Sequence, residues 1–219
     1  MISIPIKGHK DIYQMSIKYI VGLALFSLYE CSFAQTGKPL EGDSSISPDL
    51  PITISAVSNL TGNGKTFLAM TTINAPLEKI CSTIVDYSNY PQFMPNTEAI
   101  KLLESKSDYE LIEIHLRFRM GITKKYRLKM ALQTNKMSCK LSWKMIPWNE
   151  VLPSETIADT FGYWQLTPDF NNEHKTLVNY YVYVDPGFVP FGLRWFVDFM
   201  AKTSLPDILD AVRKRASKK

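Results

Sequence analysis

The sequence predicts an α+β domain in which a curved antiparallel sheet of about six to seven strands is closed by a long C-terminal helix. Two patterns support this prediction. Apolar and polar residues alternate through several segments in the middle of the chain, which is the period of strands with one buried and one solvated face. The apolar segment after Pro190 is too hydrophobic for a solvated helix, so it needs a sheet surface to cover.

Length and composition limit the class of protein. The chain has 219 residues, of which 45% are apolar and 21% charged, as expected for one globular domain with an additional segment. The formal net charge is +4, but the basic residues are spread along the chain. A nucleic-acid binder would concentrate them on one face, so we expect no nucleic-acid partner.

The N-terminus is typical of a secretory signal peptide. Lys18 precedes an uncharged apolar run at 19–29, and Ser32 and Ala34 are the small residues that a cleavage site requires. We expect residues 1–34 to be removed by a cut after Ala34, so that the protein is periplasmic or secreted.

Two alternatives to this signal peptide fit the sequence less well. An uncleaved anchor helix is disfavoured because the apolar run is about half of the roughly 20 residues that a membrane span needs. A lipid anchor on Cys31 is disfavoured because bulky and charged residues at 28–30 stand where a lipoprotein signal has small ones.

The remaining cysteines, Cys81 and Cys139, lie in apolar patterns. An oxidising compartment permits a disulfide between them, but the sequence favours two buried free thiols. The histidines His9, His115 and His174 are isolated and no C-x-x-C motif occurs, so we expect no metal site.

The domain begins after a polar segment. Residues 35–63 read as a polar tail and linker that contains one possible short strand at 52–58. Asn63 and Gly64 supply a turn before a strand at 65–74, and we place the domain itself at 64–219.

A helix and a short plug follow this strand. Pro76 opens a helix over 77–85, whose apolar residues have helical spacing. Two prolines bracket residues 86–95, where the aromatic residues suggest a second short helix or turn that packs inward.

The alternating strands then form a meander. An edge strand at 99–105 is followed by strands at 112–120, 126–132 and 137–145, each with one dry face. Two further strands, at 157–167 and 177–185, are joined by a polar loop at 168–175. The dry face of the last strand is expected to carry Val178, Tyr180, Val182 and Val184.

The closing helix runs from Pro190 almost to the C-terminus. Pro206 within it marks either a kink or the start of a second segment. The basic residues at 213–215 favour the negative end of the helix, which accounts for them without a ligand.

With these elements in order, the sequence resembles the START-like helix-grip superfamily, which includes polyketide cyclase/dehydrase-like and coenzyme-Q-binding domains. The resemblance covers roughly residues 64–216. Its motifs lie at 75–80, 86–95, 162–166 with 176–180, 185–190 and 205–207. Because the family is functionally broad, the fold alone does not settle the function.

The resemblance implies a cavity between the dry face of the sheet and the long helix. The alternative is that the same large apolar side chains simply fill a core, as most apolar stripes do. The residues expected to line the cavity are Phe118, Met120, Tyr126, Met130, Trp143, Trp164 and Tyr180 from the sheet, with Phe196, Phe199 and Met200 from the helix.

Catalytic signals are weak. No nucleophile elbow, phosphate loop or dinucleotide fingerprint occurs, and no cofactor is implied. His115 is expected on the wet face and His174 in a loop, away from the cavity. Polar residues near a possible pocket mouth, which a solvated strand end also explains, are Asn149, Glu150, Glu155 and Asp159.

The wet face of the sheet is rich in cations. A solvated face is the default explanation, and transient contact with an anionic membrane or an acidic partner is the alternative. The residues are Arg117, Arg119, Lys125, Arg127, Lys129, Lys140 and Lys144.

Two functions fit the sequence. The first is a secreted module that binds an apolar ligand such as a lipid, quinone or sterol-like molecule, with transport of that ligand between membranes as an extension of the same role. The second is a cyclase/dehydrase-type enzyme that acts on a hydrophobic substrate. The scarcity of catalytic groups favours the binding module.

Overall fold

The computed structural model describes residues 51–57, 64–188 and 194–218, all within one compact unit that spans residues 44–219. The predicted signal peptide and the start of the last helix at Pro190 lie outside the described residues. Within those ranges, no helix is both long enough and apolar enough to cross a membrane.

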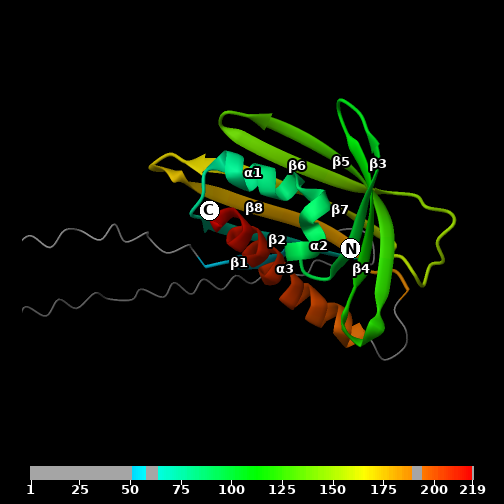
Figure 1. Cartoon of the computed structure of the whole chain (residues 1–219). Helices are drawn as coiled ribbons and strands as arrows, with labels where there is room; N and C mark the ends of the chain where they lie inside the picture. The colour runs from blue at the N-terminus through cyan, green and yellow to red at the C-terminus, as the bar shows by residue number, and fades with distance from the viewer. Residues whose placement is uncertain (1–50, 58–63, 189–193, 219) are drawn as a thin grey trace, which may run out of the picture. The chain divides into compact units, whose positions relative to one another are not determined.

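Eight strands form one antiparallel sheet, in the order β1-β2-β8-β7-β6-β5-β4-β3 (Figure 1). Consecutive hairpins build β3 to β8, and the last strand then pairs with β2. The strands are β1 Thr53–Val57, β2 Lys65–Ile73, β3 Thr97–Ser105, β4 Glu110–Arg117, β5 Thr123–Asn135, β6 Ser138–Ile146, β7 Asp159–Asp169 and β8 Asn172–Asp185. The predicted fold class is confirmed, with slightly more strands than the six to seven expected.

The helices cover one face of this sheet, which we call the inner face (Figure 1). Helix α1 packs against β6, β7 and β8 and also against α3. The opposite, outer face carries the alternate residues of each strand. The helices are α1 Leu77–Val85, η1 Tyr87–Asn89, α2 Tyr90–Phe93, η2 Arg119–Gly121 and α3 Arg194–Ser217.

The C-terminal half of α3 docks through an apolar stripe. Leu205, Leu209, Val212 and Ala216 are buried, and their spacing of four, three and four residues places them on one side of the helix. Arg213 adds a polar tie, because its Nη2 donates to Oγ1 of Thr71 in β2 at 2.7 Å. The helix continues through Pro206 as one element, so no second helix begins there.

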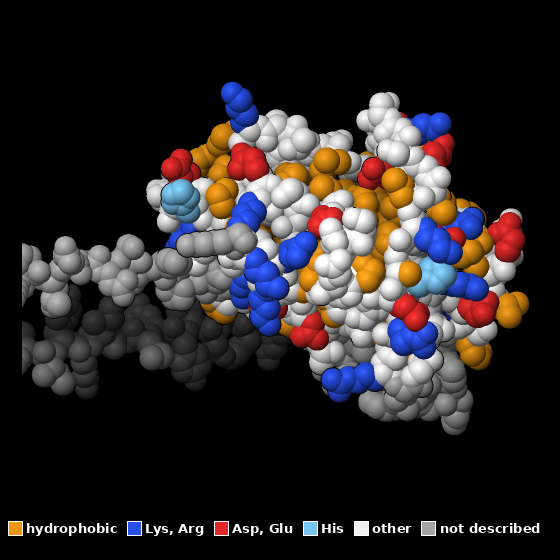
Figure 2. Space-filling view, viewed as in Figure 1, with side chains coloured by type: hydrophobic (Ala, Val, Ile, Leu, Met, Phe, Trp, Pro, Cys, Tyr) orange, Lys and Arg blue, Asp and Glu red, His pale blue; other side chains and the backbone are white. Residues whose placement is uncertain are grey.

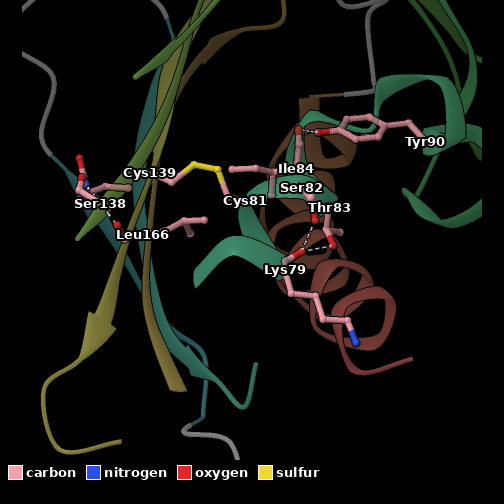
Figure 3. The surroundings of a disulfide bond; sticks show 10 residues. Lys79, Cys81, Ser82, Thr83, Ile84, Tyr90, Ser138, Cys139 and Leu166 are labelled. Atoms are coloured by element: carbon pink, nitrogen blue, oxygen red, sulfur yellow. Dashed lines mark hydrogen bonds between the residues drawn. A yellow bond between two sulfur atoms is a disulfide. The ribbon is translucent and has the colours of Figure 1, made fainter. Parts of the chain in front are cut away.

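A disulfide joins Cys81 of α1 to Cys139 of β6 (Figure 3). The expectation of two free thiols is therefore wrong. Cys139 is fully buried, as its apolar pattern suggests. The apolar pattern does not show that α1 packs on the inner face against β6. This packing brings together two cysteines that are 58 positions apart.

Two strand boundaries differ from the prediction for local reasons. Strand β4 ends at Arg117 rather than continuing to Met120, because the Phe118 N–H donates to the Ile122 carbonyl at 2.7 Å and Gly121 turns the chain at φ +74°. Asn96 accepts a hydrogen bond from the Arg117 N–H at 2.9 Å, which ties the end of β4 to the start of β3.

The polar loop predicted at 168–175 is mostly strand. Strands β7 and β8 pair as far as Asp169 and Asn172, which leaves a two-residue turn between them. Asp169 Oδ1 accepts from the Asn171 N–H at 2.9 Å, and Asn172 Oδ1 accepts from the His174 N–H at 3.0 Å. These side-chain caps stabilise a tight hairpin where the composition suggests an open loop.

Candidate ligand-binding site

The inner face of the central strands carries a cluster of aromatic rings. Tyr180 of β8 contacts Trp164 of β7 and Trp143 of β6, with ring centroids 4.4 Å and 5.5 Å apart. Trp164 and Tyr180 are buried, with 4% and 8% of their surfaces exposed, and Trp143 is half-buried. Three residues predicted to line a site therefore come together from three strands.

A glycine makes room for this cluster. Gly162 of β7 lies opposite Trp143 in the register between β6 and β7. A Cβ atom at Gly162 would lie 2.5 Å from a carbon of the Trp143 ring and 2.2 Å from the carbonyl oxygen of Tyr181. The indole can approach the strand only because this position has no side chain.

Two phenol hydroxyls on the inner face have no hydrogen-bond partner among the residues that the structure describes. They belong to Tyr126 of β5 and Tyr180. Burial raises the pKa of Tyr126 to about 12. Burial also raises the pKa of Tyr180, and a charge on Tyr126 would raise it further. Both stay protonated at neutral pH and can donate a hydrogen bond.

A third tyrosine nearby is already satisfied. The Tyr90 hydroxyl in α2 donates to the carbonyl oxygen of Ile84 in α1. Burial raises its pKa, and the neighbouring Tyr87 and Tyr180 add to the effect. Tyr90 therefore fixes α2 against α1, whereas Tyr126 and Tyr180 keep their donors for another molecule.

A cation that the sequence analysis did not single out also belongs to the inner face. Lys124 precedes Tyr126 by two positions in β5 and pairs with Leu116 of β4. Its Nζ donates to the carbonyl oxygens of Ser154 and Thr156 at 3.0 Å and 2.8 Å. Burial lowers the pKa of Lys124. The alternation of β5 is the signal that could have placed it, and its role is to hold the loop between β6 and β7.

The other predicted lining residues have three different outcomes. Met130 is buried on the inner face opposite Trp143, as expected. Phe118 is half-buried, but it lies in the turn after β4 rather than on a strand. Side chains outside those that the structure describes are Met120, Phe196, Phe199 and Met200. That these residues contact a ligand stays a prediction.

Hydrophobic side chains also reach the surface on the helix-bearing side of the molecule, between the short helix α2 and the strands β3 and β4 (Figure 2). On this side, basic and acidic side chains gather at the margins of the apolar region.

The titratable residues considered as catalytic candidates lie away from the aromatic cluster. His115 is on the outer face with Nε2 2.9 Å from Glu113, and His174 is exposed at the start of β8. Glu155 pairs with Lys125 at 3.4 Å, and Asp159 lies opposite Asp185 at the start of β7.

Asn149 and Glu150 are exposed in the loop between β6 and β7. Across the described ranges, no group of three or more histidine, cysteine, aspartate or glutamate side chains is arranged to hold a metal ion.

The architecture defines a class of protein. A curved antiparallel sheet, two short helices after the first long strand and a C-terminal helix over the inner face are the elements of a START-like helix-grip domain. Residues 73–213 match the family described as polyketide cyclase / dehydrase and lipid transport, and the chain belongs to that family.

Solved structures confirm the fold. A STAR-related lipid transfer protein from Xanthomonas axonopodis has a TM-score of 0.64 and 16% identity, over 76% of this chain and 94% of that one. The Zhui aromatase/cyclase from Streptomyces sp. R1128 gives 0.57 and 16%, over 70% and 94%. The lipid transfer and protein localization domain of human StarD13 gives 0.63 and 13%, over 77% and 85%. A comparison with curated proteins found no match.

Proposed function

We propose that this protein binds an apolar small molecule, such as a lipid, a quinone or a sterol-like molecule, against the inner face of its sheet. The observation that carries the proposal is the pair of phenol hydroxyls of Tyr126 and Tyr180, which lack partners in the described part of the chain. Neither hydroxyl is among the fully buried side-chain atoms that lack a partner, so both remain accessible to a second molecule. A ligand oxygen that accepts from one of these phenols replaces its contact with water, and such a hydrogen bond contributes about 0.5–1.5 kcal/mol.

The site therefore selects a ligand with two features. Its body is apolar, because Trp143, Trp164 and Met130 offer polarisable apolar surface. It carries one oxygen acceptor, such as a carbonyl or hydroxyl, because Tyr126 and Tyr180 are protonated donors. The lipid transfer names of the Xanthomonas and human relatives agree with such a ligand.

The test is to identify what the protein carries. Purified protein is extracted with organic solvent and the extract is analysed by mass spectrometry. We expect a bound molecule with an apolar body and a carbonyl or hydroxyl group. Protein that releases no such molecule and takes up none of a panel of lipids, quinones and sterols would refute the proposal.

Trp164→Lys tests where the ligand binds. A charge in the buried aromatic cluster should abolish uptake, while circular dichroism monitors how much of the fold remains. The matched control is Tyr163→Phe, the next residue along β7, which faces outward. Unchanged uptake by the Trp164→Lys protein would exclude the inner face as the site.

A cyclase or dehydrase activity is the second candidate, because two phenol hydroxyls without protein partners in the described part of the chain lie on the inner face. Tyr126 and Tyr180 could polarise a substrate carbonyl. Neither histidine of the described ranges lies near them, so a general base is not evident there. Incubation of the protein with its extracted ligand distinguishes the two functions: a ligand recovered unchanged indicates binding, and a converted one indicates an enzyme.

We also infer that the protein acts outside the cytoplasm, where it could carry its ligand between membranes. The signal-peptide pattern of residues 1–34 and the Cys81–Cys139 disulfide both support an oxidising compartment.

A further inference from the structure

The outer face of the central strands carries stacked aromatic rings where the sequence predicts a solvated face. Phe161 and Tyr183 stack with centroids 4.7 Å apart, and Tyr163 and Tyr181 stack at 5.2 Å. Both pairs bridge β7 and β8 on the side of the sheet opposite the helices. Phe161 is 37% exposed and the three tyrosines are half-buried. The outer face is therefore amphipathic rather than merely wet.

Uncompensated positive charge lies beside these rings. Lys144 of β6 is paired in register with Lys129 of β5 on one side and with Phe161 on the other. Lys140 holds its Nζ 4.9 Å from the Tyr163 ring centroid. Among the described residues, none of these three lysines forms an ion pair with a carboxylate. The Lys129 Nζ lies over the Tyr109 ring, 4.0 Å from its centroid, so the uncompensated charge of the three is that of Lys140 and Lys144.

Other cations of the same face are neutralised. Arg127 donates through Nε and Nη2 to Oε2 of Glu113, each at 3.1 Å, and Lys125 pairs with Glu155. The free charge is thus concentrated toward β6, next to the aromatic pairs.

A hollow of about 370 Å³ opens on this face, lined by Leu68, Lys140, Tyr163, Gln165 and Asn179. Its lining contains one cation, two carboxamides and no acid. The Asn179 carboxamide has no partner in the described part of the chain, whereas the Gln165 amide donates to Ser138 at 2.9 Å. The chemistry of this hollow fits an anionic group that also accepts hydrogen bonds, with an apolar portion against Leu68.

We propose that this outer patch, formed by Lys140, Lys144, Phe161, Tyr163, Tyr181 and Tyr183, docks the protein on an anionic phospholipid surface, with a head-group phosphate in the hollow beside Lys140. Tyrosine is favoured at the head-group level of a bilayer, and each lysine near an anionic surface strengthens binding. An acidic protein partner fits less well, because lysine is depleted in protein interfaces. The inference goes beyond the proposed function, since it does not require a ligand on the inner face.

The experiment is vesicle co-sedimentation with phosphatidylcholine alone and with phosphatidylcholine that contains phosphatidylglycerol. The protein is used as isolated from expressing cells, and its N-terminus is determined by mass spectrometry, because an uncleaved apolar segment would bind vesicles by itself. We expect binding to the anionic vesicles that weakens with salt. Lys140→Gln and Lys144→Gln should each weaken it about fivefold.

The matched control is Arg119→Gln, which removes the same charge from the β4–β5 turn and should leave binding unchanged. Phe161→Ser should weaken the binding that remains at high salt, with thermal unfolding recorded to confirm that the variant folds.

Four results would overturn the proposal: equal binding to both vesicles, equal losses in Lys144→Gln and Arg119→Gln, no vesicle binding, or binding of soluble glycerol phosphate without binding of vesicles.

Discussion

At the residue scale, the proposed functions depend mainly on tyrosines. These tyrosines have different roles according to the face of the sheet on which they lie. Tyr126 and Tyr180 present protonated hydroxyls on the inner face. Tyr163 and Tyr181 stack on the outer face. In the functions that we propose, the same residue type supplies a hydrogen-bond donor for an apolar ligand on one side and an interfacial ring on the other.

Tyr180→Phe should weaken ligand binding about threefold to tenfold, because one hydrogen bond contributes about 0.5–1.5 kcal/mol. The measurement is titration of tryptophan fluorescence, which Trp164 and Trp143 report because both contact Tyr180. Tyr163→Phe is the control and should bind normally. An equal loss in both variants would contradict a specific role for the Tyr180 hydroxyl.

Glu113 should make the free energy of unfolding depend on pH in the acidic range. Burial alone would raise the pKa of this carboxyl, but hydrogen bonds from His115 and Arg127 outweigh it and lower the pKa below the usual 4.5. The contribution is therefore present above pH 4.5 and is lost as the pH falls through the lowered value. Glu113→Gln should cost about 1–3 kcal/mol at pH 7 and flatten the acid limb of urea unfolding. A steeper acid limb in the variant would contradict this assignment.

At the element scale, helix α1 is fixed to the sheet by covalent and noncovalent contacts together. Its buried residues, among them Ile80 and Ile84, pack on the inner face, and Cys81 is bonded to Cys139 of β6. Lys79 adds a hydrogen bond from its Nζ to the carbonyl oxygen of Lys218 at 2.7 Å, which ties α1 to the end of α3. These contacts fix α1 to the sheet and to α3.

Removal of the disulfide by Cys81→Ala with Cys139→Ala should lower the free energy of unfolding by about 4 kcal/mol, the loop-closure value for a separation of 58 residues. Chemical denaturation measures it. Reduction of the unaltered protein is the control and should give a similar loss. A double variant as stable as the oxidised protein would show that the disulfide contributes little.

Gly162→Ala should disturb both the aromatic cluster and the pairing of β7 with β8. A methyl group there would lie 2.2 Å from the Tyr181 carbonyl oxygen and 2.5 Å from the Trp143 ring, so the backbone of β8 and the indole must both move. We expect a lower melting temperature, a shifted tryptophan emission spectrum and weaker ligand uptake. An unchanged emission spectrum would contradict the close approach of Trp143 to β7.

At the scale of the whole molecule, the sheet links the two proposed surfaces back to back. Strands β6, β7 and β8 carry the inner cluster on one side and the outer patch on the other, so a docked protein would keep its helix-bearing side away from the lipid surface. The pairing of β8 with β2 brings the last strand beside the first long one. This closure places α3 over the inner face.

The protein isolated from its own compartment should begin at Gln35 and contain the Cys81–Cys139 disulfide. The signal-peptide pattern predicts the cut, and oxidation follows from the compartment. Intact mass spectrometry before and after reduction and alkylation measures both. A chain that retains residues 1–34 would favour the anchor alternative, and alkylation without prior reduction would contradict an oxidising location.

The sequence by itself determined the features of the fold that follow from local residue patterns. Period-two alternation places Trp143, Trp164 and Tyr180 on the dry face, because this signal depends only on neighbours along the chain. The α+β class and the helix-grip family follow from the order of those elements.

Only the tertiary structure decided which distant residues meet. The bond between Cys81 and Cys139, the contact of Trp143 with Tyr180 and the stacking of Tyr163 on Tyr181 all depend on strand register and on the placement of α1. Register is set by long-range pairing and packing, which the local pattern of one strand does not contain. The same limit explains why alternation identified an outer face but did not show that its aromatic residues stack beside unpaired lysines.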